Sequence, residues 1–362
     1  MKEATVTNTL AVTIQDAPIP IPQPGQLLIR VVTAGINPKD WKLPLFFLKD
    51  APPSNQGDDI AGYVEAVGDG VLNFKKGDRV GALHQMFTPH GGYAEYAIAW
   101  AYTTLHLDEK VSFEEASTIP LAATTAALAL YQRLRLPPPW NPRAADSDTP
   151  GPLIIYGGST AVGSFAIKLA SLSNIHPLIV IAGAGAPHVE TLIDRTKGDT
   201  ILDYRGITDP ATLEVKIRDA AKGANIHHAF DAVAEAGSYQ AIAAALAAPG
   251  KIVGVWPPRA EDRAEGVKFP VGIEVDSVMV GSVHADAVAG EMVGDREFGA
   301  VFSGFLGRAL AEGWLKGHPA EVRPGGLKGI EGALRDLQDG RVSAVKYVVN
   351  IAETEGIQGE GS

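Results

Sequence analysis

The chain has 362 residues, of which 46% are hydrophobic and 20% are charged, a composition typical of a soluble globular protein long enough for two domains. Its 31 basic and 42 acidic residues give a net charge of -11, which argues against a nucleic-acid partner because phosphate binding needs a positive surface. Cysteine is absent, which excludes disulfides, thiolate nucleophiles and thiolate metal sites.

The N-terminal stretch from Met1 to Thr5 leads into polar residues and shows no apolar run of the kind found in a signal peptide. The longest apolar segments, residues 120–130 and 178–184, are shorter than the roughly 20 residues that a membrane-spanning helix needs. We therefore expect a cytoplasmic protein that does not interact with a membrane.

The first 120 residues predict short strands separated by Gly, Pro and Asp turns, an arrangement typical of an all-β unit. These strands are expected at residues 27–32, 60–67, 79–83 and 92–98. A stretch rich in Pro and polar residues, 136–152, predicts a surface loop after this unit.

From residue 153 onward, apolar strands alternate with Ala-rich helical patterns, which predicts a parallel, doubly wound sheet. The strands are expected at residues 153–156, 178–181, 200–204, 228–233, 251–255 and 277–280. The helices are expected at residues 161–172, 188–196, 211–222 and 238–248. Two later amphipathic segments, 297–311 and 326–338, and an apolar strand at 345–351 either extend this sheet or return to the first unit.

A glycine-rich turn follows the first strand of this sheet and opens a helix. Gly158 and Gly163 match the outer glycines of the dinucleotide fingerprint, whereas Thr160 replaces the middle one. Small residues let the backbone approach a pyrophosphate, and a helix N-terminus presents unpaired N–H groups to it. The alternative is a turn whose glycines serve packing alone. The predicted cofactor-binding residues in the turn are Gly158, Ser159, Thr160, Ala161, Val162 and Gly163.

The second strand ends without the Asp or Glu that usually holds the ribose 2′-hydroxyl of NAD. The neutral loop at residues 183–187 tolerates a 2′-phosphate, and His188 or Arg205 is expected to supply the positive charge that this phosphate prefers. NADPH is therefore the predicted cofactor. His188 has an alternative interpretation as a solvated surface histidine.

Four motifs resemble the zinc-independent quinone oxidoreductase branch of the medium-chain dehydrogenase/reductase superfamily. They lie at residues 57–68 (GDDIAGYVEAVG), 74–80 (FKKGDRV), 91–96 (GGYAEY) and 202–205 (LDYR). The resemblance implies an α/β protein in which a GroES-like β-barrel catalytic domain surrounds a doubly wound Rossmann cofactor domain, with catalysis in the cleft between them. The implied domains are residues 1–122 and 291–352 for catalysis, 123–290 for nucleotide binding and 353–362 for a flexible tail.

A narrower resemblance, to the fungal trans-acting enoyl reductases of polyketide biosynthesis and their ToxD-like relatives, is carried by three segments. These segments are residues 36–42 (INPKDWK), 124–129 (TTAALA) and 156–161 (YGGSTA). In that family a Ser-Thr pair replaces a glycine of the phosphate turn, so the Thr160 hydroxyl is expected to donate to a phosphate.

The resemblance implies NADPH-dependent reduction of an activated carbon–carbon double bond. The implied substrate is a small-molecule or carrier-tethered unsaturated acyl group, the implied partner is a polyketide synthase, and the protein is expected to be a monomer or a homodimer. Two alternatives remain open: a quinone or general enone reductase that acts on free small molecules, and a non-catalytic NADPH-binding scaffold or sensor.

Metal dependence is not expected. The zinc-dependent relatives place a metal-binding Cys where this chain has Asn37, and they carry four further cysteines for a structural zinc. No histidine pair shows metal-binding spacing either. Without a Lewis acid, the substrate must already be polarised for hydride attack, as a conjugated carbonyl compound is.

The candidate catalytic residues are Lys42 and Thr125, because the matching positions in the resembled reductases lie beside the substrate and the nicotinamide. Lys42 is expected to stabilise enolate charge or to relay a proton, and its alternative interpretation is a solvated lysine at a strand end. Asn37 and Asp40 are expected to order the ribose or orient Lys42, although the Asn-Pro-x-Asp spacing equally fits a turn.

Three further cofactor contacts are predicted outside the glycine-rich turn. Tyr204 belongs to the strand-end motif that contains Arg205. Ser282 and His284 follow the sixth predicted strand and are expected near the nicotinamide amide. The alternative for His284 is a packed loop histidine.

Overall fold

The computed structural model describes residues 1–144, 151–207, 209–234, 237–257, 269–286 and 294–357. The chain divides into two compact units, of which unit 1 comprises Met1–Leu121 and Gly281–Ser362 and unit 2 comprises Ala122–Val280. The predicted domain boundaries at residues 122 and 290 lie one and ten residues after these divisions. Within these described ranges, no helix has the length and apolar character needed to cross a membrane.

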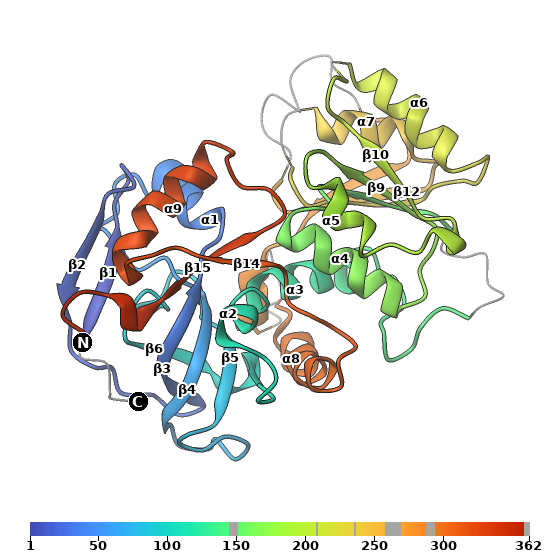
Figure 1. Cartoon of the computed structure of the whole chain (residues 1–362). Coiled ribbons are helices and arrows are strands. Elements are labelled where there is room, and N and C mark those ends of the chain that lie inside the picture. The colour runs from blue at the N-terminus through green and yellow to red at the C-terminus, as the bar shows by residue number, and fades with distance from the viewer. Residues whose placement is uncertain (145–150, 208, 235–236, 258–268, 287–293, 358–362) are drawn as a thin grey trace. The chain divides into compact units, whose positions relative to one another are not determined.

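Unit 1 is built around a mixed sheet to which both ends of the chain contribute. In the described part of the unit, the sheet order is β14-β15-β3-β4-β5-β7, and β6 pairs with β3. The C-terminal part of the chain returns to this sheet, where β15 pairs with β3 in antiparallel register. In Figure 1, β15 is the red strand and β3 the blue strand beside it. The strands of this sheet are β3 Gln26–Gly35, β4 Asp59–Val67, β5 Arg79–Leu83, β6 Tyr96–Trp100, β7 Thr104–His106, β14 Ala320–Val322 and β15 Lys346–Asn350. Two further strands of unit 1, β1 Lys2–Val6 and β2 Val12–Asp16, pair with each other in a separate sheet.

The long strands β3 and β4 bend where their register shifts, at Leu28/Ile29 and at Val31/Thr33. Gly62 permits the close approach of the two strands, because a Cβ atom there would lie 2.1 Å from the carbonyl oxygen of Arg30. Such irregularities allow a sheet to curve, as a barrel requires.

Short helices link the strands of unit 1, and two longer helices, α8 and α9, come from the C-terminal part of the chain. Helix α9 packs its apolar residues Ile330, Ala333 and Leu334 into the core of this unit. The helical segments are α1 Lys39–Lys42, η1 Leu43–Phe47, η2 Ala101–Thr103, α2 Phe113–Ala116, η6 Val280–His284, α8 Arg296–Ala311, η7 Gly326–Lys328, α9 Gly329–Gln338 and η8 Ile351–Glu353.

Unit 2 contains a parallel sheet whose order, among the residues described, is β10-β9-β8-β11-β12-β13. Numbered from its first strand, this order is 3-2-1-4-5-6, that of a doubly wound dinucleotide-binding sheet. In Figure 1, α4 and α5 lie on one side of the sheet and α6 and α7 on the other. The strands are β8 Leu153–Tyr156, β9 Leu178–Ala182, β10 Thr200–Asp203, β11 His228–Asp231, β12 Gly250–Gly254 and β13 Ile273–Ser277.

The helices of unit 2 connect consecutive strands, and they follow a helix, α3, that begins at the end of unit 1. The segments are α3 Pro120–Ala127, η3 Leu128–Arg133, α4 Ala161–Leu172, α5 Ala186–Glu190, η4 Arg195–Lys197, α6 Pro210–Ala220 and α7 Ser238–Ala245. The predicted α/β fold class, with a β-rich unit and a doubly wound parallel sheet, is therefore confirmed.

Three sequence expectations differ from the structure or extend beyond it. The prediction of the sixth strand at residues 277–280 is wrong, because β13 lies earlier in the chain, at Ile273–Ser277. This strand alternates apolar with polar residues, as an edge strand does. The helix expected at 188–196 ends at Glu190, after which Asp194 caps the separate turn Arg195–Lys197. The predicted surface loop includes residues 145–150, which lie outside the described residues.

The predicted tail begins inside unit 1. Thr354 is buried, and its hydroxyl oxygen accepts a hydrogen bond from the backbone N–H of Leu327 at 2.9 Å. Residues 358–362 of that predicted tail lie outside the described residues.

Candidate functional site

The glycine-rich turn of unit 2 joins the end of β8 to the start of α4. Gly157 adopts a left-handed conformation, with φ of +78°. At Gly158 a Cβ atom would lie 2.1 Å from Val180 Cγ1, and at Gly163 it would lie 2.2 Å from the carbonyl oxygen of Gly157. The strand, the turn and the helix therefore pack so closely that only glycine fits at these positions.

Thr160 is the N-cap residue of α4. Its side-chain oxygen accepts a hydrogen bond from the backbone N–H of Gly163 at 2.9 Å. A hydroxyl that accepts one hydrogen bond still carries its own hydrogen for donation, so the cap is compatible with the predicted contact to a phosphate. Ser159, Ala161 and Val162 stand beside it, at the N-terminus of a helix of 12 residues.

The ends of the neighbouring strands β9 and β10 extend this edge of the sheet. Tyr204 follows β10, and its ring stacks against that of Tyr156 with centroids 6.1 Å apart. Gly183 leaves room for the Tyr204 ring, because a Cβ atom there would lie 2.9 Å from Tyr204 Cε1. The predicted residues Tyr204 and Gly158 therefore belong to the same carboxyl edge of the parallel strands, where doubly wound proteins bind ligands.

Arg205 and His188 differ in the charge that they offer. The exposed Arg205 pairs with Asp203, Nη2 to Oδ2 2.6 Å, and holds the pKa of this carboxyl at about 2. Burial lowers the pKa of His188 and the charge of Lys168 lowers it further, so its imidazole is neutral near pH 7. Of the two predicted residues, Arg205 is thus the one that carries positive charge.

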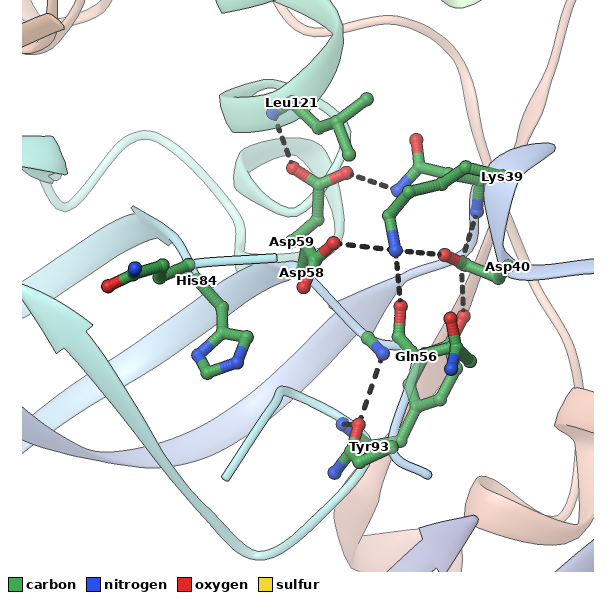
Figure 2. Close-up of polar contacts among 12 residues, drawn as sticks. Lys39, Asp40, Gln56, Asp58, Asp59, His84, Tyr93 and Leu121 are labelled. Atoms are coloured by element: carbon green, nitrogen blue, oxygen red, sulfur yellow. Dashed lines mark hydrogen bonds and ion pairs between the residues drawn. The ribbon is translucent and has the colours of Figure 1, made fainter. Parts of the chain in front are cut away.

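In unit 1, three of the motifs singled out in the sequence converge on one set of polar side chains, all buried except the partly exposed Lys39. We call this set the buried charge cluster. Its members are Asn37, Lys39, Asp40, Asp58, Asp59, Tyr93 and Lys346. Figure 2 shows the centre of this cluster, where the ammonium of Lys39 lies between the carboxylates of Asp40 and Asp58.

The ammonium of Lys39 meets three oxygens. Its Nζ lies 2.7 Å from Asp40 Oδ1 and 2.5 Å from Asp58 Oδ2, and it donates to the carbonyl oxygen of Gln56 at 2.7 Å. Burial alone would lower the pKa of Lys39, but the two carboxylates outweigh it and raise this pKa above its ordinary value. Lys39 is therefore a fixed positive charge inside unit 1.

Asp40 and Asp59 connect separate segments of unit 1. Asp40 Oδ2 accepts from the Asn37 backbone N–H at 2.7 Å and from the Tyr93 hydroxyl at 2.6 Å. Asp59 accepts from Asn37 Nδ2, from Lys346 Nζ and from the backbone N–H of Leu121, at 2.7, 2.5 and 2.7 Å. Burial raises the pKa of Asp40, and the nearby Lys39 opposes this shift.

Lys42 is the last residue of α1, two residues after Asp40 of the buried charge cluster. Its Nζ lies 5.5 Å from the ring centroid of Trp41, and the side chain is half-buried. The widened turn η1 follows directly, because the Leu48 N–H donates to the carbonyl oxygen of Leu43, five residues earlier. Turns of this type occur frequently at functional sites.

The other candidate catalytic residue, Thr125, lies on α3 within unit 2 and is 6% exposed. Lys42 belongs to unit 1, so their participation in one active site stays a prediction. Asn37 and Asp40 form hydrogen bonds within the buried charge cluster. These bonds are compatible with a turn-forming role and with the orientation of Lys42.

Ser282 and His284, predicted beside the nicotinamide, belong to η6 and to unit 1. The Ser282 hydroxyl donates to Asp295 Oδ2 at 2.6 Å, and His284 Nε2 lies 3.2 Å from Thr103 Oγ1. Burial lowers the pKa of His284 to about 4, and the nearby His84 contributes to this shift. A neutral, packed imidazole therefore occupies this position near pH 7.

No role was predicted from the sequence for Lys39, Asp58, Asp59, Tyr93 and Lys346. A signal was present, because Asp58 and Asp59 directly precede an apolar strand and Lys346 opens another. Charged residues at such positions are buried only when they are paired.

A metal site is a separate question. Across the described ranges, no group of three or more His, Asp or Glu side chains is placed to hold a metal ion. The metal-free reaction stays a prediction.

Residues 23–109 match the family model of the alcohol dehydrogenase GroES-like domain. The trans-enoyl reductase fsr4 of Gibberella fujikuroi is 46% identical over 330 residues, which cover 91% of this chain and 92% of that protein. A trans-enoyl reductase of Alternaria alternata is 33% identical and covers 94% of this chain, with 96% of its own length matched. The crystal structure of the CurK enoyl reductase is similar in fold, with a TM-score of 0.73, 18% identity and coverage of 96% of this chain and 98% of its own.

Proposed function

The chain belongs to the fungal trans-enoyl reductases of the medium-chain dehydrogenase/reductase superfamily, whose members are nicotinamide-dependent oxidoreductases, and we propose that it uses NADPH to reduce an α,β-unsaturated acyl thioester. The observation that carries the proposal is the glycine-rich turn at the N-terminus of α4. There, backbone atoms fill the space that a Cβ atom would need at Gly163, and Val180 fills it at Gly158.

The residues of the turn suit the diphosphate of a dinucleotide. A helix N-terminus favours a bound anion through its backbone N–H groups, and Gly158, Ser159 and Thr160 precede it. The 2′-phosphate of NADPH is assigned to Arg205, which is charged and exposed. The bound cofactor supplies the hydride that the β-carbon of the substrate receives.

Lys42 is assigned to the carbonyl oxygen of the thioester. Negative charge develops on this oxygen when the β-carbon is reduced, and an ammonium group placed beside it stabilises that charge. Lys39 cannot take this role, because its ammonium is already held by Asp40, Asp58 and the Gln56 carbonyl. Thr125 is the second candidate for a substrate contact.

The acyl chain is proposed to arrive on the carrier of a polyketide synthase. This proposal is supported by the relatives, several of which are named trans-enoyl reductases. Each of them matches more than nine-tenths of the length of this chain. The alternative is a reductase that acts on free small molecules such as quinones or enones.

The test is an NADPH-oxidation assay with an α,β-unsaturated thioester and with a simple quinone, each with and without a chelator. We expect oxidation that depends on the thioester, is faster with NADPH than with NADH and is indifferent to the chelator. Turnover of the quinone alone would favour the alternative reductase, and binding of NADPH without turnover of either would favour the scaffold. Loss of activity with the chelator would contradict the metal-free reaction.

A further inference from the structure

We propose that Tyr93 and Asp40 are positioning residues for Lys42: the hydroxyl of Tyr93 fixes the carboxylate of Asp40, and this carboxylate fixes the first turn of the helical segment, α1, that ends at Lys42. The inference rests on the proposed function, because it gives these two residues a role in the reaction through Lys42.

The first argument is the geometry around Asp40. One oxygen, Oδ2, accepts from the Asn37 N–H at 2.7 Å and from the Tyr93 hydroxyl at 2.6 Å, while Oδ1 meets Lys39 Nζ at 2.7 Å. The carboxylate of Asp40 therefore contacts Asn37, Lys39 and Tyr93 at once, and Tyr93 lies 53 residues later in the chain.

The second argument is the shortness of the helical segment that carries Lys42. The four residues of α1 continue directly into the five residues of η1. A helix of fewer than about 12 residues is marginal in isolation, because its few backbone hydrogen bonds do not offset the entropy of nucleating it. At its start, the Asp40 N–H donates to Asn37 O at 3.0 Å, the Lys42 N–H donates to Pro38 O at 3.1 Å, and the Leu43 N–H donates to Lys39 O. The side-chain contacts of Asp40 add to these bonds in the first turn, which ends at Lys42.

The third argument is the cost of the buried charge cluster. Desolvating charged groups costs several kcal/mol for each ion, and apolar side chains of similar volume often stabilise a fold as well or better. Asp40 and Asp59 are fully buried, and Lys346 is only 4% exposed. What such a network provides beyond stability is a single orientation for the segment that it holds, here residues 37–40, which lead directly into Lys42.

The fourth argument is that Tyr93 is itself held rigidly. Its ring is fully buried, and its backbone N–H donates to Asn55 Oδ1 at 3.1 Å. The chain at Gly57 passes so close that a Cβ atom there would lie 2.5 Å from Tyr93 Cδ1. Replacement by Phe therefore removes the hydroxyl and leaves the packing of the ring in place.

The experiment is a double-mutant cycle of Tyr93→Phe and Lys42→Met, with kcat and KM measured for an α,β-unsaturated thioester and NADPH. If Tyr93 acts through Lys42, Tyr93→Phe lowers kcat about tenfold in the wild-type background and less than about twofold in the Lys42→Met background. Equal losses in both backgrounds would mean a general structural role and would overturn the proposal. It would equally be overturned if Lys42→Met kept wild-type kcat.

Tyr347→Phe is the matched control, because Tyr347 is another buried tyrosine of unit 1 and its ring packs under Arg323. It is expected to keep wild-type kcat. If Tyr93→Phe does not fold, Asp40→Asn replaces it in the cycle, since the amide keeps the size of the carboxylate and removes its charge.

Amide hydrogen exchange of the same proteins gives a readout that needs no turnover. We expect faster exchange at Asp40 and Lys42 in Tyr93→Phe than in wild type, with unchanged exchange in the sheet of unit 1. Wild-type protection at both amides would overturn the positioning role. Absence of thioester reduction by the wild-type protein would instead defeat the proposed function, and the exchange experiment would still decide whether Tyr93 orders α1.

Discussion

The side-chain oxygen of Thr160 lies 2.9 Å from the backbone nitrogen of Gly163, so the residue that interrupts the glycine pattern of the phosphate turn also caps helix α4. Gly163 in turn approaches Gly157 so closely that no side chain fits between them. One threonine thus stabilises the start of the helix and keeps a hydroxyl hydrogen at the place where a phosphate is expected.

Replacement of Thr160 by Val is expected to weaken NADPH binding by about 1 kcal/mol, roughly fivefold in Kd, if one neutral hydrogen bond to phosphate is lost. Loss of the cap is expected to reduce the free energy of unfolding by a further amount of about 1 kcal/mol. The measurements are a fluorescence titration with NADPH and thermal unfolding without cofactor. Thr160→Ser keeps the hydroxyl and should behave as wild type in both. Equal Kd values for wild type and Thr160→Val would remove Thr160 from the phosphate site.

Replacement of Gly158 by Ala tests the close packing of the turn. The new methyl group would overlap Val180 Cγ1, and Val180 is fully buried in β9. We expect a loss of about 1 to 3 kcal/mol in the free energy of unfolding and weaker NADPH binding. Gly304→Ala is the control, because Gly304 lies in helix α8 and a Cβ atom there meets nothing within 4 Å. If Gly158→Ala kept the wild-type stability and NADPH affinity, the turn would be able to accommodate a side chain at this position.

Much of unit 2 could be predicted from the sequence because its strands are apolar runs buried on both faces. β8 and α4 were predicted with the observed bounds, Leu153–Tyr156 and Ala161–Leu172. β13 was missed for the opposite reason, since Glu274 and Asp276 alternate with apolar residues on an edge strand. A continuous apolar run identifies a strand buried on both faces, whereas a short alternating strand at the edge of a sheet gives a weaker signal.

The buried charge cluster could not be predicted in the same way. Asp59 and Lys346 are 287 residues apart in the chain and meet only because β15 returns to pair with β3. Local patterns identified the motif that contains Asp59 but not its partner. Tertiary structure alone shows that Asp40 and Asn37, which the sequence placed in a turn, also bind Tyr93 and Asp59.

Replacement of Lys42 by Met is expected to lower kcat strongly, by about 100-fold if its charge stabilises the developing enolate, while the Kd for NADPH changes little. The reason is that the residues assigned to the phosphates belong to unit 2, whereas Lys42 belongs to unit 1. Steady-state assays measure kcat, and a cofactor titration measures the Kd for NADPH. Lys49→Met, which removes an exposed lysine of the same segment, is the control. Unchanged kcat in Lys42→Met would exclude Lys42 from the mechanism.

Replacement of Arg205 by Met tests the assignment of the 2′-phosphate. Charged hydrogen bonds to phosphate are stronger than neutral ones, so we expect the Kd for NADPH to rise about tenfold while the Kd for NADH stays near its wild-type value. Arg195→Met is the control, because Arg195 forms a comparable exposed ion pair with Glu190 in the same unit. If Arg205→Met raised the Kd for NADPH and the Kd for NADH equally, Arg205 would maintain the conformation of the loop and would not bind the 2′-phosphate.

The burial of His284 predicts a loss of stability in mild acid. Its pKa in the folded protein is about 4, below the ordinary value of 6.5, so the unfolded chain takes up a proton as the pH falls below 6.5 while the folded chain does not. The contribution of His284 is therefore complete above pH 6.5 and is lost as the pH falls toward 4, by about 3 kcal/mol over the whole range. Urea unfolding of wild type and His284→Asn at pH 7, 5.5 and 4 measures this difference, because the carboxylates that titrate in the same range are common to both proteins. His106→Gln, which removes an exposed histidine, is the control. Parallel curves for wild type and His284→Asn would mean that His284 takes up its proton in the folded state, and that its contact with Thr103 does not depend on a neutral ring.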